Sequence, residues 1–108
     1  MGNKERIKQL EKFRKEDPND PFNIYALALE YLHLDKAKSM ELFEELLKNH
    51  PDYIGTYYHA AALFTEFGDN DRANNTYLKG IEVAKRKNET HALRELQSAY
   101  LNFQFETE

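Results

Sequence analysis

The chain has 108 residues, of which 41% are hydrophobic, 13% aromatic and 31% charged. This length suits one domain with one core, and the aromatic content excludes a disordered tail. The net charge of −4 is spread over both signs without a basic stripe, so we expect no nucleic-acid partner. There is no cysteine, which excludes disulfides and thiolate metal sites. No apolar run approaches the roughly 20 residues that span a bilayer, and the N-terminus lacks an apolar signal core. We therefore expect a cytoplasmic protein without a membrane partner.

The first predicted element is a helix over residues 3–17. Its apolar residues recur at i, i+3 and i+6: Ile7, Leu10 and Phe13. Pro18 cannot continue this helix. Asn19 or Asp20 is placed to cap the next helix, with Pro21 in its first turn.

Four further helical segments follow. The stretch "FNIYALALEYLHL" is apolar on all sides, which indicates a helix buried on both faces. "DKAKSMELFEELLKNH" has one apolar face, Asp35 as its predicted cap, and "HPDY" as its stop. Next come a helix over 53–67, a turn at Gly68 and Asp69, and a helix over 71–86.

The last predicted helix covers residues 90–105. Its apolar positions recur with helical spacing: Leu93, Leu96, Tyr100 and Phe103. No segment alternates with period two for long enough to form a strand. The sequence therefore predicts an all-α fold of about six helices joined by tight turns, an antiparallel α-hairpin array.

The hairpins repeat one another along the chain. Positions 33 residues apart match on the first helix of each pair: Ile24 with Tyr57, Leu27 with Ala60, Ala28 with Ala61, and Tyr31 with Phe64. On the second helix the spacing is 34: Ser39 with Ala73, Phe43 with Tyr77, and Leu46 with Gly80. The change from 33 to 34 indicates one missing residue between Tyr31 and Ser39, in the turn of the first hairpin.

This pattern resembles the tetratricopeptide repeat (TPR) family, whose 34-residue unit consists of two helices with aromatic and small residues at fixed places. Repeat 2 carries Tyr57, Ala60, Ala61, Phe64, Gly68, Ala73, Tyr77 and Gly80, but has Lys85 in place of the final proline. Repeat 1 carries Ile24, Leu27, Ala28, Tyr31, Ser39, Phe43, Leu46 and Pro51, but lacks the turn glycine.

The resemblance implies a single TPR-like domain over residues 1–108, folded as an α-α superhelix. Its expected parts are an N-terminal helix or half repeat (3–17), repeat 1 (21–53), repeat 2 (54–87) and a C-terminal capping helix (89–105). We expect small residues where the helices cross closely: Ala28, Ala61, Ala73 and Gly80. The terminal helices are expected to cap the ends of the array.

The resemblance also implies a concave groove that binds a peptide or a helix of another protein. The corresponding positions are Phe22, Tyr25, Leu29, Leu32, His33, Tyr58, Ala62, Thr65 and Glu66, with Arg94 and Ser98 from the last helix. The family's carboxylate-binding clamp needs Lys and Asn where this chain has Tyr25, Leu29, Tyr58 and Ala62. We therefore expect an aromatic and apolar groove. The alternative is that the first or last helix covers Tyr25, Leu29 and Leu32.

No cofactor, metal site or catalytic site is expected. The histidines (His33, His50, His59, His91) form no His-x3-His pair, and no nucleophile motif or phosphate-binding loop is present. The leading hypothesis is a protein-interaction scaffold whose partner the sequence does not identify. The alternative is a self-associating homodimer, with the groove or the last helix as its two-fold interface. On the last helix, Phe105 with Tyr100 would dock on a second copy. A small enzyme or enzyme subunit is the remote third hypothesis.

Overall fold

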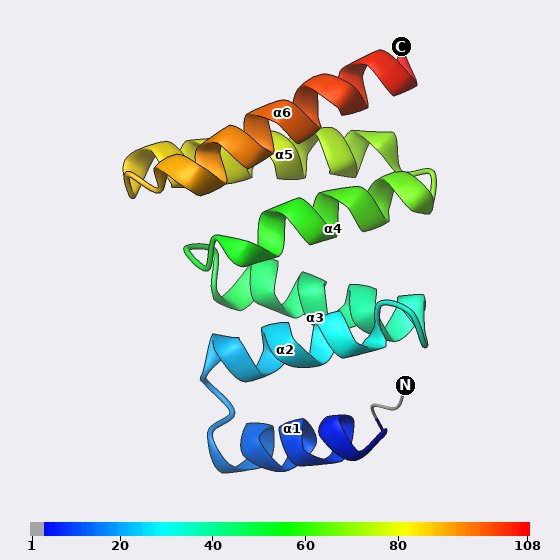
Figure 1. Ribbon diagram of the computed structural model, residues 1–108, viewed down its shortest axis with the longest axis vertical. Helices are drawn as coiled ribbons and strands as arrows, with labels where there is room; N and C mark the ends of the chain where they lie inside the picture. Colours follow the sequence, from blue (N-terminus) through cyan, green and yellow to red (C-terminus); the bar gives the residue numbers. More distant parts are fainter. Residues whose placement is uncertain (1–3) are drawn as a thin grey trace. The chain divides into compact units, whose positions relative to one another are not determined.

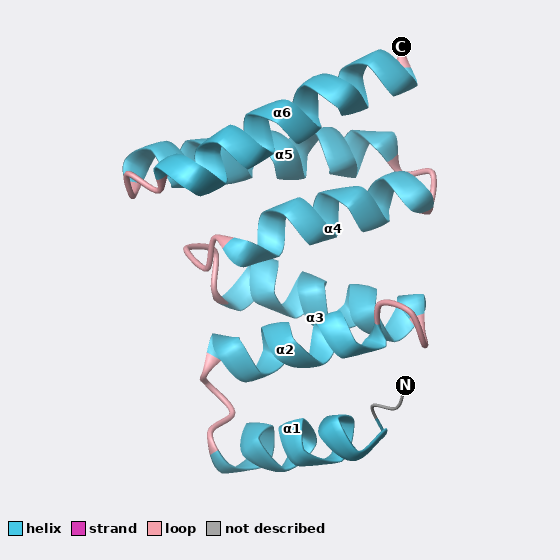
Figure 2. Ribbon diagram, viewed as in Figure 1, coloured by secondary structure: helices cyan, strands magenta, loops and turns pink. Residues whose placement is uncertain are grey.

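The computed structural model describes residues 4–108. The helices are α1 (Lys4–Glu16), α2 (Pro21–Tyr31), α3 (Lys36–Asn49), α4 (Gly55–Glu66), α5 (Asn70–Arg86) and α6 (Thr90–Thr107). All other described residues lie in short turns and at the chain's end, and none forms a strand (Figures 1 and 2). The predicted all-α fold with six helices is confirmed.

The helices divide into two compact units. Unit 1 ends at Tyr53, and unit 2 runs from Ile54 to Glu108. In unit 1, α2 packs against both α1 and α3. In unit 2, α5 packs against both α4 and α6, and α4 also contacts α6 (Figure 1). The boundary between the units falls where repeat 1 meets repeat 2 in the sequence, while the single domain over 1–108 stays a prediction.

Aspartates cap three of the helices. The Phe22 amide donates to the Asp20 carboxylate over 3.0 Å, and the Lys38 amide donates to Asp35 over 3.1 Å. Asp69 accepts from the Arg72 amide over 3.2 Å. Each bond satisfies one of the amides that a helix N-terminus leaves unpaired. The caps predicted at Asp20 and Asp35 are confirmed.

The predicted helix ends differ from the observed ones by at most three residues. The helix predicted over 53–67 begins at Gly55, and the one predicted over 71–86 begins at Asn70, directly after the Asp69 cap. The last helix continues beyond the predicted end to Thr107. Asn3, the predicted first residue of the first helix, lies outside the described residues.

The turn between α2 and α3 explains the shorter spacing of repeat 1. In repeat 2, the Asp69 amide bonds to the Phe64 carbonyl five residues back over 2.9 Å, and Gly68 between them has a φ of 82°. In repeat 1, the Asp35 amide bonds to the Tyr31 carbonyl only four residues back over 2.8 Å. The shorter closure needs no left-handed residue, so repeat 1 can lack the glycine.

The repeat positions form the cores of the two units. In repeat 2, every matched position except Gly68 is buried. In repeat 1, the matched positions are buried except for Tyr31, which is half-buried, and Pro51, which is exposed. Ala28, Ala61 and Ala73 have no exposed surface, and the buried Ser39 hydroxyl donates to the Ala28 carbonyl over 2.7 Å. Small residues therefore occupy close approaches between helices, as predicted.

Helix α1 combines little apolar burial with ion pairs to its neighbours. Leu10 is its only buried residue among those described, and Phe13, predicted to continue the apolar stripe, is 48% exposed. Of the apolar stripe, only Leu10 is thus buried, and near its C-terminal end α1 meets α3 through polar contacts. The Arg14 guanidinium donates to both carboxylate oxygens of Glu45 on α3, over 2.6 and 2.7 Å.

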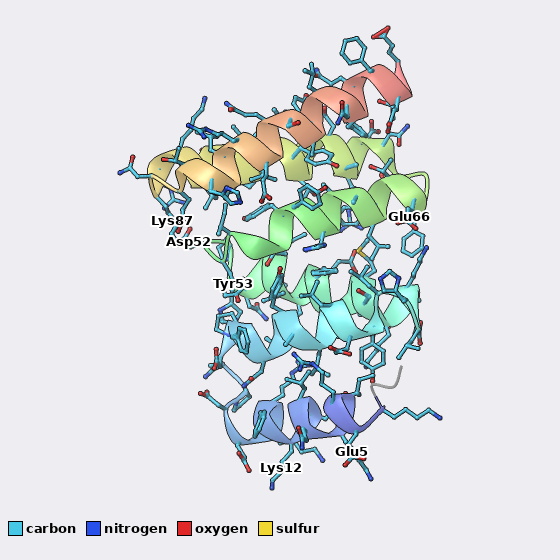
Figure 3. The ribbon with its side chains drawn as sticks, viewed as in Figure 1. Glu5, Lys12, Asp52, Tyr53, Glu66 and Lys87 are labelled. Atoms are coloured by element: carbon cyan, nitrogen blue, oxygen red, sulfur yellow. The ribbon has the colours of Figure 1, made fainter. Side chains whose placement is uncertain are left out.

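Helix α1 also has a second ion pair and a solvated face. Arg6 pairs with Glu30 of α2 over 2.7 Å. Glu5 and Lys12 extend away from the rest of unit 1 (Figure 3). One side of α1 thus meets α2 and α3, while its other side is charged, as we expect of an end helix.

Helix α6 packs through an aromatic cluster in unit 2. The Phe103 ring lies 5.4 Å from the Tyr77 ring, and the Tyr100 ring lies 5.8 Å from it. The Tyr100 hydroxyl donates to the Asn74 side chain over 2.7 Å. Leu96 and Phe103 are buried, whereas Phe105 is 69% exposed. Tyr100 is therefore engaged within unit 2, and Phe105 is not.

Candidate functional site

Two adjoining clefts form a groove between α4 and α6 in unit 2. The first has a volume of about 480 Å³ and is lined by Tyr58, His91, Arg94, Glu95, Ser98, Ala99 and Asn102. The second, of about 300 Å³, is lined by Tyr58, Ala62, Thr65, Glu66, Tyr77, Ala99, Asn102, Phe103 and Glu106. Because they share Tyr58, Ala99 and Asn102, we treat the two clefts as one feature and call it the α4–α6 groove.

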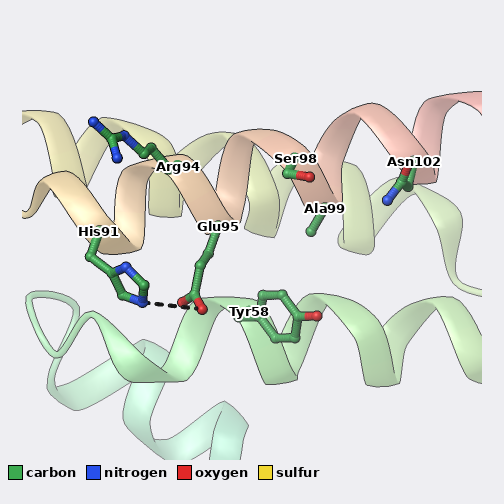
Figure 4. A pocket seen from close by; sticks show the side chains of 7 residues that line it. All are labelled: Tyr58, His91, Arg94, Glu95, Ser98, Ala99 and Asn102. Atoms are coloured by element: carbon green, nitrogen blue, oxygen red, sulfur yellow. Dashed lines mark ion pairs between the residues drawn. The ribbon is translucent and has the colours of Figure 1, made fainter.

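The two walls of the groove run in the same direction. Tyr58, near the start of α4, faces the first half of α6, and Glu66, at the end of α4, lines the same cleft as Glu106. The Tyr58 ring lies between the two helices, below Ser98 and Ala99 (Figure 4). It is 45% exposed, so a large aromatic surface is open to a ligand.

One end of the groove carries a carboxylate between histidines. Glu95 points toward α4, and His91 lies 3.4 Å from it, a pair that is ionic only when His91 is protonated (Figure 4). Burial lowers the pKa of His59 on α4 from its usual value, and the nearby Glu95 carboxylate offsets part of that shift. Arg94 lies on the rim and is exposed.

The other end of the groove is aromatic and acidic. Tyr77 and Phe103 lie beside the carboxylates of Glu66 and Glu106. Burial raises the pKa of Tyr77 above its usual value, with smaller contributions from Tyr58 and Glu106. The Thr65 hydroxyl donates to the Ala61 carbonyl over 3.0 Å, so its methyl group is the part left for apolar contact. This end combines apolar surface with negative charge.

The structure brings together the groove residues predicted on unit 2. Tyr58, Ala62, Thr65, Glu66, Arg94 and Ser98 all line the α4–α6 groove. Their role in binding stays a prediction.

The predicted residues on α2 lie in unit 1 and do not line this groove. Phe22 is 56% exposed, and Tyr25 packs against Tyr53 with ring centroids 5.3 Å apart. Leu29 and Leu32 are half-buried, and His33 is exposed in the turn after α2. A cleft of about 410 Å³ in unit 1 is lined by other residues: Pro21, Asn49, His50, Pro51, Asp52 and Tyr53. One groove along both repeats stays a prediction.

Several residues of the α4–α6 groove were not predicted: His91, Glu95, Ala99, Asn102 and Glu106 on α6, with Tyr77 and Phe103 from the aromatic cluster. A signal for the α6 residues was present in the sequence. Glu95, Ala99, Asn102 and Glu106 follow one another at helical spacing beside Arg94 and Ser98. The helix face that carries Arg94 and Ser98 therefore also indicates these α6 residues.

Over residues 4–108, no group of three or more His, Asp or Glu side chains is arranged to hold a metal ion. Within the same range, no helix combines the length and the apolar character that crossing a membrane requires.

Comparisons with solved structures identify the family. A crystal structure of a tetratricopeptide repeat domain protein from Salinibacter ruber is 45% identical, with a TM-score of 0.75, over 79% of this chain and 96% of that chain. A solution NMR structure of a tetratricopeptide repeat domain protein from the same organism is 46% identical, also with a TM-score of 0.75, over 81% of this chain and 89% of that one. The crystal structure of MamA shares the fold, with a TM-score of 0.64 at 17% identity over 93% of this chain and 67% of that one.

A curated relative agrees with these structures. Interferon-induced protein with tetratricopeptide repeats 2 from Mus musculus is 37% identical over 59 residues. The match covers 55% of this chain but only 12% of that relative, so this chain corresponds to a small part of its length. No sequence profile of a known protein family matches the chain.

The chain belongs to the tetratricopeptide repeat family. This follows from the identity to the Salinibacter ruber domain over nearly that domain's whole length, together with the buried repeat positions. The fold is typically a protein–protein interaction scaffold without catalytic activity of its own.

Proposed function

We propose that the protein binds a segment of another protein in the α4–α6 groove. The observation that carries this proposal is that Tyr58 stands exposed at the junction of the two clefts. Exposed aromatic side chains in concave surfaces are the usual anchors of protein interfaces, since they bury much area at small entropic cost. Contacts of α4 with α5 and α6 form the groove without a partner present, and a preformed groove lowers the cost of binding.

The test is capture of partners from the native cell by the tagged protein, by its Tyr58→Ala variant and by its Leu78→Ala variant. Leu78 is an exposed apolar residue of α5 that does not line the groove, so it is a matched control. We expect a protein held by the wild type and by Leu78→Ala but lost from Tyr58→Ala, with all three equally folded by circular dichroism. Equal recovery by all three variants would place the binding surface elsewhere.

Self-association is the second candidate function. Leu101 and Phe105 are four residues apart on α6, and they are 54% and 69% exposed. Residues at this spacing share one helix face, so together they present an apolar patch outside the groove. If this patch forms a two-fold contact, the Phe105→Ala variant has the mass of a monomer in solution, and Tyr58→Ala retains the mass of the wild type. Multi-angle light scattering over a concentration series distinguishes the monomer from the dimer for each variant.

A further inference from the structure

The α4–α6 groove carries carboxylates at both ends. Glu95 lines one end, and Glu66 and Glu106 line the other. The fixed positive charge among the lining residues is Arg94, which lies on the rim. Leaving His91 aside, carboxylates outnumber cations along the lining by three to one. Such a groove attracts a positively charged segment and repels a negatively charged one, nucleic acid included.

The polar groups on α6 suit an extended backbone. Ser98 and Asn102 are exposed, and neither side chain has a hydrogen-bond partner among the described residues. They are four residues apart, which corresponds to about 6 Å along a helix. An extended chain presents peptide groups on one side about every 6.6 Å, so both side chains can bond to one peptide backbone. A helical partner would have no free backbone groups to offer them.

The spacing of the carboxylates sets the spacing of the partner's charges. Glu95 and Glu106 are eleven residues apart on α6, about 16 Å along its axis. An extended segment covers this distance in about five residues. Since alternate side chains of an extended segment point the same way, basic residues four to six apart can flank apolar ones. Those apolar residues would lie against the exposed Tyr58 ring and against Ala62.

From these observations we infer that the partner of the α4–α6 groove is an extended basic segment, with one or two apolar residues between two Lys or Arg residues. This inference rests on the proposed function, since it names the class of segment that the same groove takes. The charge complementarity selects the segment, and the aromatic surface holds it.

The experiment measures fluorescence anisotropy of labelled, end-blocked peptides with the full chain. The basic probe is Lys-Ser-Leu-Ser-Leu-Ser-Lys. One control probe has both lysines replaced by glutamate, a second has both replaced by serine, and a third has both leucines replaced by serine. We expect the basic probe to bind roughly tenfold tighter than the lysine-free probe, an advantage that shrinks as salt is added. The probe without leucines should lose binding about thirtyfold.

A pair of charge-reversal variants tests the site. The variant Glu66→Lys with Glu106→Lys changes two exposed groove residues, and Glu82→Lys with Glu108→Lys makes the same change of net charge outside the groove. We expect the first variant to prefer the glutamate probe and the second to behave as the wild type. If both variants bind the basic probe equally weakly, the effect comes from net charge, and the inference is overturned.

The outcomes also separate this inference from the proposed function. If the lysine-free or glutamate probe binds the wild type as tightly as the basic probe, and Tyr58→Ala abolishes that binding, the groove binds peptides without the proposed charge selection. Only the present inference then fails. If no probe binds and Tyr58→Ala retains every protein partner of the wild type, both fail.

Discussion

The backbone of Gly80 on α5 lies directly against the side chain of Tyr57 on α4. A methyl group at position 80 would stand 2.6 Å from Tyr57 Cβ, 2.9 Å from Tyr57 Cγ and 3.2 Å from a methyl of Leu96 on α6. The two nearest atoms are at the base of the Tyr57 side chain, so they cannot move without shifting α4. Gly80 is thus where α5 approaches both of its neighbours.

We therefore expect Gly80→Ala to destabilise the protein although alanine favours helices. Alanine gains about 1 kcal/mol of helix propensity over glycine, but overpacking of this contact costs about 1–3 kcal/mol, so we expect a net loss of about 1 kcal/mol. Gly80→Leu should lose more of the free energy of unfolding. Urea unfolding measures this free energy for both variants. Asn75→Ala, at an exposed position of the same helix, is the control and should gain a few tenths of a kcal/mol. A stabilised Gly80→Ala would contradict the close approach.

Thr56 on α4 carries a buried hydroxyl without a hydrogen-bond partner among residues 4–108. Thr56→Val replaces this hydroxyl with a methyl group of similar size, so we expect the free energy of unfolding to rise by about 1 kcal/mol. Ser39→Ala is the matched opposite case. Its buried hydroxyl bonds to the Ala28 carbonyl over 2.7 Å, and its loss should cost about 1–2 kcal/mol. Losses of equal size in both variants would show that the Thr56 hydroxyl is bonded in solution.

The Arg14–Glu45 ion pair should stabilise the packing of α1 against α3 within unit 1. Both side chains are about 30% exposed or slightly less, and the contact is bidentate, so we expect a coupling energy of about 1 kcal/mol. A double-mutant cycle with Arg14→Met and Glu45→Gln, read from hydrogen exchange of the α1 amides, measures it. The pair Lys79–Glu82 is more exposed and should couple by less than about 0.5 kcal/mol. Equal coupling in both pairs would show that the bidentate, less exposed geometry of the Arg14–Glu45 contact adds nothing over an exposed pair.

His59 should make unit 2 less stable in mild acid. Its pKa is lowered in the folded state, chiefly by burial, so the unfolded chain binds a proton at a higher pH than the folded protein does. The stability contributed by neutral His59 is complete above the unfolded pKa of about 6.5 and is lost as the pH falls toward the folded pKa.

The measurement compares urea unfolding of the wild type and His59→Gln at several pH values from 8 downward. The glutamine variant should lose less stability than the wild type as the pH falls below about 6.5, because glutamine takes up no proton. A constant difference between the two proteins across this range would show that His59 does not titrate differently in the folded state.

The helices could be predicted because each leaves a local signature. Asp20 and Asp35 precede their helices at the capping position, and the aromatic and small residues recur with the period of the repeat. These signals act over a few residues or over one fixed period. The single missing residue between Tyr31 and Ser39 was likewise visible as a change of spacing, and the closure at Asp35 accounts for it.

Contacts made by residues outside the repeat pattern could not be predicted in the same way. Arg14 and Glu45 are 31 residues apart, and nothing in either local sequence indicates the partner. Phe13 follows the apolar spacing of α1 and is nevertheless half exposed, because helical periodicity does not say how far a neighbouring helix extends. The groove was predicted as apolar from Tyr58 and Ala62, while its carboxylates on α6 fall outside the repeat pattern.

The turn closures bear on how the chain tolerates changes of length. The closure at Asp35 spans four residues, and the closure at Asp69 spans five. Each is a backbone hydrogen bond from the amide of the capping aspartate to the carbonyl of an aromatic residue, Tyr31 or Phe64. A residue gained or lost in such a turn leaves the start of the next helix tied to the same aromatic position. We therefore expect an insertion between His33 and Leu34 to be absorbed within the turn. In such turns, repeats of unequal length can arise without disturbing the cores that the turns connect.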